Sequence, residues 1–241
     1  MSDGVRFYSA GPLSVFVIIL LIALVIILIP LLILGIIGAA FTRLGFSWIA
    51  ALAVVLLMLL GSFVNIPVYR IRRDMVRVSQ SESTVFDECV PCAPSASGQV
   101  WDTTISINFG GAVIPVCVSL YMMYQAILIT GTSLFFPVCA GITVVSIITF
   151  ISTRLVTYAG IQVPLLIPGF TALLAGLLFA GGTGLTAAVT AFVGGVTGVL
   201  LGGYIANLYR IKNLEVPEVS FGGAGSFGSI FICCVLPALI A

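Results

Sequence analysis

The charged residues of this chain are few and separate long apolar stretches. The uncharged stretches are residues 7–42, 44–69, 103–153, 155–209 and 219–241. A membrane-spanning helix needs about 20 apolar residues, so the two longest stretches have room for two helices each. Glycine and hydroxyl residues interrupt both near the middle, at residues 130–133 and 181–184. The pattern therefore predicts an all-α, polytopic membrane bundle of about seven transmembrane helices, with residues 1–241 forming a single transmembrane domain.

The composition excludes several classes of protein. Hydrophobic residues make up 61% of the chain and charged residues only 7%, whereas a soluble domain has about 25% charged residues. The chain contains no histidine, which rules out histidine-ligated zinc or haem and histidine proton shuttles. A net charge of +1 argues against a nucleic-acid partner. The bilayer itself is the expected environment.

The positive charges predict how the helices are oriented. With seven spans, one side of the membrane receives nearly all the Lys and Arg residues: Arg6, Arg70, Arg72, Arg73, Arg77, Arg154, Arg210 and Lys212. The other side receives only Arg43. Because cytoplasmic loops are enriched in these residues, we expect a multi-pass protein of the cell membrane with its N-terminus inside and its C-terminus outside. The first apolar run, residues 13–41, is too long for a signal peptide and is predicted to be the first span.

Residues 70–102 form the expected cytoplasmic loop. Arg70, Arg73 and Arg77 fall at helical spacing, with apolar residues on another face. This pattern predicts a short amphipathic helix in the inner interface, where the arginines attract anionic lipids. A solvated loop end is the alternative.

The same loop contains a Cys-x-x-Cys motif, Cys89 to Cys92. The two cysteines are a candidate thiol pair. A tetrahedral zinc site needs four ligands, and the chain offers neither histidine nor a second such motif. We therefore predict no metal and no cofactor, and leave open whether the pair has a redox role.

Three sites interrupt the predicted helices: Asn65, Asn108 and the glycine-rich residues 222–228. Only 13 residues follow Gly228, which is about 20 Å of helix and less than the bilayer core of about 30 Å. The last segment is therefore either partly unwound or a half-span. The interiors of the spans contain no ionisable residue, which argues against proton relays and carboxylate-dependent proteolysis. We expect no enzymatic activity.

Such breaks resemble the discontinuous helices with which transporters hold substrates. The candidate ligand-binding residues are Asn65, Asn108, Ser119, Tyr204, Asn207, Gly222, Gly223, Gly225 and Ser226. Close packing of glycine against a neighbouring backbone is the alternative explanation. Two functions follow: a transporter- or channel-like protein for a small polar solute, or an accessory subunit of a membrane assembly.

The accessory interpretation depends on a glycine ridge. Gly194, Gly198 and Gly202 repeat at an interval of four residues. Such ridges bring helices into close contact within one chain or between chains. The second possibility includes a homo-oligomer or a larger membrane complex.

The same motifs carry a family resemblance. Asn65-Ile66-Pro67, Asn108-Phe109-Gly110-Gly111 and Gly222-Gly223-Ala224-Gly225-Ser226-Phe227 resemble stretches of an uncharacterised family of multi-spanning membrane proteins from archaea and bacteria. The resemblance implies architecture rather than activity, because the family has no established function. Many of its members carry Asp at the positions of Tyr204 and Gly228, and the chain lacks both carboxylates.

The charge asymmetry gives a direct topology test. A reporter fused after Ala241 should be active only outside the cytoplasm, because eight of the nine Lys and Arg residues then lie inside. An alkaline phosphatase and a fluorescent-protein fusion measure the two alternatives. Cytoplasmic fluorescence would contradict the seven-span prediction.

Overall fold

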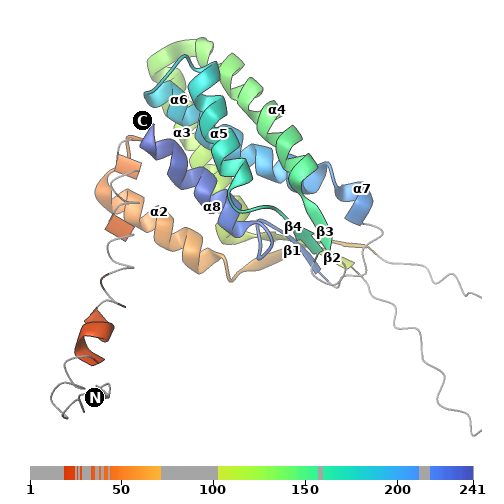
Figure 1. Ribbon diagram of the computed structural model, residues 1–241. Helices are drawn as coiled ribbons and strands as arrows, with labels where there is room; N and C mark the ends of the chain where they lie inside the picture. Colours follow the sequence, from red (N-terminus) through yellow and green to blue (C-terminus); the bar gives the residue numbers. More distant parts are fainter. Residues whose placement is uncertain are drawn as a thin grey trace, which may run out of the picture.

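The structure is a computed structural model that describes residues 44–71, 103–156, 160–211 and 218–240, with scattered positions between 19 and 42. It is mostly helical, and short strands gather at one end of a helical bundle (Figure 1). The α-helices are α2 (Trp48–Gly61), α3 (Ile114–Thr130), α4 (Phe135–Ser152), α5 (Ile167–Phe179), α6 (Leu185–Val199), α7 (Leu208–Ile211) and α8 (Phe227–Val235). Two π-helices, η1 (Phe109–Val113) and η3 (Leu200–Ile205), and two 3₁₀ segments, η2 (Gly131–Leu134) and η4 (Leu236–Leu239), extend them.

The strands form two small sheets. In the first, β2 (Thr103–Asn108) lies in the centre, antiparallel to β1 (Asn65–Ile71) and parallel to β5 (Glu218–Phe221). The second is a hairpin of β3 (Arg154–Val156) and β4 (Gly160–Gln162). The first sheet thus joins three segments that are far apart in the sequence.

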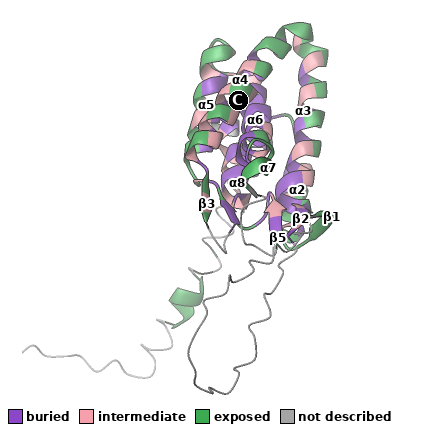
Figure 2. Cartoon of the chain, turned by 90° about the vertical axis from the view of Figure 1, so that its right-hand side faces the viewer, coloured by how far each residue is buried: buried purple, intermediate pink, exposed green. Residues whose placement is uncertain are grey.

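Helix α6 is the centre of the bundle and packs against α3, α4, α5 and α8. Figure 2 shows it as a largely buried helix. Small residues make this possible. A Cβ atom added at Gly198 would lie 2.6 Å from Val145 Cβ of α4, and one added at Gly195 would lie 2.8 Å from Cys233 Cβ of α8. The glycines therefore set the distance between α6 and its neighbours.

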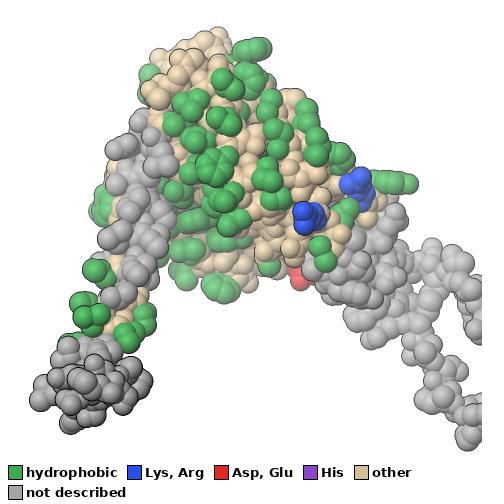
Figure 3. Space-filling model, in the orientation of Figure 1, with side chains coloured by type: hydrophobic (Ala, Val, Ile, Leu, Met, Phe, Trp, Pro, Cys, Tyr) green, Lys and Arg blue, Asp and Glu red, His purple; other side chains and the backbone are tan. Residues whose placement is uncertain are grey.

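Helix α5 places small residues inside and large apolar residues outside. On α5 the buried residues include Ala172 and Gly176, whereas Leu174 and Leu178 are 56% and 75% exposed. The apolar side chains on the visible outer face are spread over the helices in Figure 3. A water-soluble bundle has the opposite arrangement, with large apolar side chains inside and polar ones outside.

Two helical stretches are long and apolar enough to cross a membrane, judged by length and composition. They are Phe109–Ser152, with 44 residues, and Leu185–Arg210, with 26 residues. The first comprises η1, α3, η2 and α4, and the second α6 to α7. Both predicted interruptions are confirmed: Gly131 has a φ of 70° between α3 and α4, and Gly181 has a φ of 76° between α5 and α6. Glycine adopts this left-handed conformation without steric strain.

The prediction of an all-α chain is wrong at several segments. Residues 65–69 continue as strand β1 rather than as the end of a span, and residues 103–108 form β2 rather than the start of one. Pro67 removes a backbone donor that a helix would use, and the β-branched residues of both segments suit a strand. Asn65 and Asn108 are therefore strand residues at helix ends. The last segment is β5, a turn and the nine-residue α8.

The prediction of an amphipathic helix is also wrong for its first two residues. Arg70 and Ile71 belong to β1, where they pair with Thr104 and Thr103. Pairing with β2 supplies hydrogen bonds that a helix start would leave unmade. The remainder of the loop, with Arg73, Arg77, Cys89 and Cys92, lies outside the described residues.

The contact between α6 and α4 predicts the effect of filling it. Gly198→Leu should lower the unfolding temperature in detergent by several degrees, because the side chain would overlap Val145. Thermal unfolding followed by circular dichroism measures this. Ala206→Leu is the control, since Ala206 is exposed just beyond η3. Equal stability of the two variants would mean that Gly198 does not face α4.

Candidate functional site

The candidate site is the junction at which three chain breaks meet: the end of α2, the start of η1 and the turn before α8. Asn108, which is buried, connects the first two. Its side-chain amide donates to the Ser62 carbonyl oxygen at 2.6 Å and to Asn65 Oδ1 at 2.9 Å. Its Oδ1 accepts from the Gly111 backbone N–H at 2.7 Å. One carboxamide thus binds the end of α2 and caps η1.

The third segment, β5 with the turn that follows it, is connected to the junction by a hydrogen bond between Ser220 and Asn65. Asn65 pairs with Asn108 across the β1–β2 ladder. The Ser220 hydroxyl of β5 donates to Asn65 Oδ1 at 2.8 Å. Asn65 Oδ1 therefore accepts hydrogen bonds from side chains of both other strands of the sheet.

Glycine contacts bring the same segments together at the backbone. A Cβ atom at Gly110 would lie 2.0 Å from the Met58 carbonyl oxygen of α2, and one at Gly111 would lie 2.0 Å from the Gly222 carbonyl oxygen. On the other side of the turn, a Cβ atom at Gly225 would lie 2.0 Å from the Ile161 carbonyl oxygen of β4. Any side chain at these positions would force the segments apart.

Helix α8 begins directly after this turn, at Phe227, with Ser226 in the N-cap position. The sequence predicts a last segment that is partly unwound or a half-span, and α8 has only nine residues. The Ser226 side chain does not cap the helix. Instead its hydroxyl lies 2.5 Å from the Tyr204 hydroxyl of η3, which also hydrogen-bonds the Gly222 backbone. The Tyr204 ring packs against Phe221, with the ring centroids 4.6 Å apart.

The structure brings together most of the predicted site residues. Asn65, Asn108, Tyr204, Gly222, Gly223, Gly225 and Ser226 all belong to the junction or its turn. Asn207 does not: its amide donates to the Gly202 and Gly203 carbonyl oxygens at the end of η3. The Ser119 hydroxyl bonds the Pro115 carbonyl oxygen of its own helix. Gly194, Gly198 and Gly202 face α4.

Several residues of the junction were not predicted from the sequence. Ser62 contributes only a carbonyl oxygen to the junction, and Ser220 lies within the stretch 219–241 that the apolar pattern assigns to a span. Ser106 of β2 donates to Glu218 Oε1 of β5 at 2.5 Å. A period-two alternation in residues 103–107 was the available signal, because it indicates a strand and hence cross-strand partners.

The polar groups of the junction are paired with one another, and the adjoining cavity is apolar. This cavity, of about 340 Å³, is lined by Ile107, Ala112, Val116, Leu200, Ile205 and Phe221 among others. Among the described residues, no three His, Cys, Asp or Glu side chains lie together as a metal site would require. The described polar groups of the junction thus act as hydrogen-bond donors and acceptors toward one another.

The junction falls within the region that matches a known family. The model of a family of proteins of unknown function, DUF1614, matches residues 59–240. The chain belongs to the DUF1614 family. The expected membership of an uncharacterised family is confirmed, and the family description assigns no activity. Searches of curated proteins and of solved structures found no significant match.

The three hydrogen bonds of Asn108 predict that it stabilises the fold. Asn108→Ala should lower the unfolding temperature in detergent by several degrees, because the half-buried Ser62 carbonyl and the buried Gly111 N–H lose their partner, at about 1–3 kcal/mol for the buried group. Differential scanning fluorimetry measures the shift. Gln125→Ala removes an exposed carboxamide on α3 and serves as the control. An Asn108 variant as stable as this control would exclude a structural role for the junction.

Proposed function

We propose that this DUF1614 protein is a multi-pass membrane protein that handles a small, uncharged polar solute at the junction, in a transporter- or channel-like manner. Membrane insertion is supported by the exposed apolar side chains on the outer helices together with the small residues buried around α6. Lipid tails are as apolar as leucine, so helices in lipid associate through small residues. The seven-span arrangement includes α2 to α6 and α8, with the N-terminal apolar run as the first span.

The ends of the bundle support the proposed orientation. Arg70, Arg154 and Arg210 belong to β1, β3 and α7, which lie at the strand end of the bundle (Figure 1). The C-terminus lies at the opposite end, where the Gly184 N–H donates to the Ile240 carbonyl oxygen at 2.7 Å. The positive-inside rule then favours the strand end at the cytoplasmic face of the membrane and the C-terminus at the outer face.

The meeting of three chain breaks is the observation that carries the solute proposal. Non-helical backbone inside a membrane is tolerated where protein or a wet cavity surrounds it, and transporters bind substrates at such places. The Asn108–Asn65–Ser220 chain and the Tyr204–Ser226 pair offer donors and acceptors without formal charge. A solute would bind by replacing hydrogen bonds between these groups with hydrogen bonds to itself. This favours a neutral polar molecule over a bare cation.

The accessory-subunit alternative loses the surface on which it depended. A Cβ atom at Gly202 would lie 2.1 Å from the Ser146 carbonyl oxygen of α4, and one at Gly194 would lie 3.2 Å from Gly141. The ridge is therefore covered by the chain itself. A partner would need a different face.

Solute permeation through liposomes containing the full chain tests the proposal. Under an osmotic gradient of glycerol or urea, these liposomes should equilibrate faster than empty ones, as followed by light scattering. Tyr204→Phe, which removes the bond to Ser226 but keeps the ring, should change the rate at least several-fold. Tyr124→Phe, at an exposed position on α3, should not. If the wild-type chain passes neither solute, or both variants behave alike, the junction is only a structural joint.

A further inference from the structure

One side of the π-helix η3 is exposed between α3 and α4. These two helices both pack on α6 but make few contacts with each other beyond η2. Towards the strand end, Leu201 and Ile205 of η3 are 39% and 51% exposed in the gap. The gap is therefore open to the surroundings of the protein, and its floor is apolar.

Two grooves lie in this gap, one on each side of Ile205. The larger, of about 700 Å³, runs along the second half of α4 and is lined by Ile142, Ile147, Phe150, Ile151, Leu201 and Ile205 among others. The smaller is the apolar cavity beside Phe221, of about 340 Å³, which also includes Ile205. Both are open apolar grooves rather than closed cavities, because exposed side chains form their edges.

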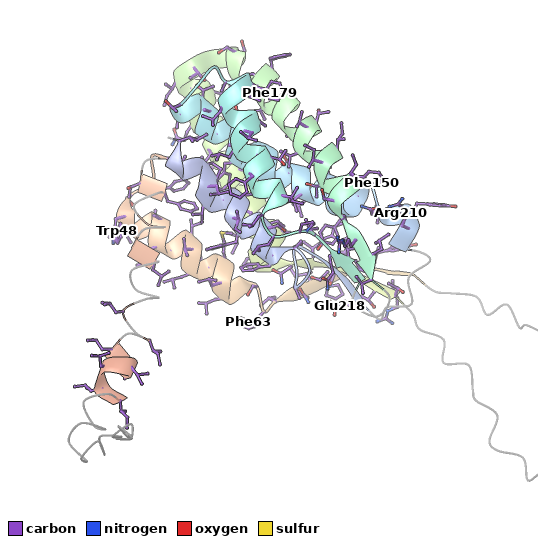
Figure 4. The ribbon with its side chains drawn as sticks, viewed as in Figure 1. Trp48, Phe63, Phe150, Phe179, Arg210 and Glu218 are labelled. Carbon is purple, nitrogen blue, oxygen red and sulfur yellow. The ribbon has the colours of Figure 1, made fainter. Side chains whose placement is uncertain are left out.

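Positive charge lies at the strand end of the larger groove. The Arg210 guanidinium carbon is 5.4 Å from the centre of the Phe150 ring, which lines the groove. Figure 4 shows these two side chains close together at this end. Arg154 follows α4 and lines a third hollow, of about 460 Å³, that shares Ile151 with the larger groove.

No described carboxylate pairs with either arginine. Glu218, the one acidic side chain in the described ranges from residue 44 onward, accepts its short hydrogen bond from Ser106. Among the described residues, Arg210 thus stands without a carboxylate partner at the strand end of the larger groove, and Arg154 does so in the adjoining hollow. Positive charge at one end of an apolar surface complements a lipid that has an anionic head group and apolar chains.

We propose that the gap between α3 and α4 binds an anionic phospholipid. Its acyl chains lie in the two grooves on either side of Ile205, and its phosphate lies between Arg210 and Arg154. Arginine suits this role because its planar group presents several donors to a phosphate. The proposal uses the membrane location proposed above but not the solute, so a lipid site can exist whether or not the junction transports anything.

Lipid titration of the purified full chain in an uncharged detergent tests the site. Dioleoyl phosphatidylglycerol should bind saturably, seen as one retained lipid in native mass spectrometry and as a rise in unfolding temperature. Dioleoyl phosphatidylcholine should give a smaller rise, and glycerol phosphate, which has no chains, none. Equal responses to the two phospholipids, or a full response to glycerol phosphate, would overturn the proposal.

Variants separate the head-group and chain parts of the site. Arg210→Gln and Arg154→Gln should each weaken phosphatidylglycerol binding about fivefold, the loss expected for one interfacial arginine. Arg43→Gln makes the same charge change on the side of the chain predicted to face outward and should leave binding unchanged. Thr143→Trp, at an exposed position in the larger groove, should abolish retention without lowering stability in the absence of lipid. Equal losses for Arg43→Gln and Arg210→Gln, or full retention by Thr143→Trp, would contradict a site in this gap.

Discussion

Every interruption of a helix leaves backbone N–H and C=O groups that need partners, and in an apolar environment the chain itself must supply them. This requirement explains the strand end of the molecule. After α2 ends, β1 pairs with β2, and β2 pairs with β5. Where the sheet stops, Asn108 caps η1 with its side-chain oxygen, and Asn207 closes the end of η3 with its amide. Asn65, Asn108 and Asn207 thus lie at the ends of helices or strands.

The second consequence concerns how closely the segments approach. Helix α6 has neighbours on most of its sides. Because its glycines lack side chains, the backbone of α4 and the Cys233 side chain of α8 can lie close to it. At the junction, Gly110, Gly111, Gly222 and Gly225 contact other backbones in the same way. The two π-helices lie at these contacts, and each contains a Gly-Gly pair. Widened helical turns of this kind are frequent at functional sites. Here they place Tyr204 of η3 and Gly111 of η1 against the turn before α8.

Sequence reasoning predicted the helical core and its interruptions well, because apolar length and glycine position are local signals. It also grouped Asn65, Asn108 and residues 222–228 as breaks, and the structure brings these together. It missed the sheet, because the short alternation in residues 103–107 opens a long apolar stretch whose length indicates helices, and residues 65–69 could equally end a span. The Ser220 and Ser62 contacts were beyond reach, since they depend on strand register. The direction of the Gly194–Gly198–Gly202 ridge likewise depends on which helix covers it.

Amide hydrogen exchange of the full chain in lipid nanodiscs tests the central claim most directly, namely that the breaks are closed by hydrogen bonds within the chain. Peptides covering residues 103–111 and 218–226 should exchange as slowly as those of α6. The exposed residues 131–133 of η2 should exchange within seconds. If residues 103–111 and 218–226 instead exchange as fast as that turn, the strands and the Asn108 contacts do not hold the junction together.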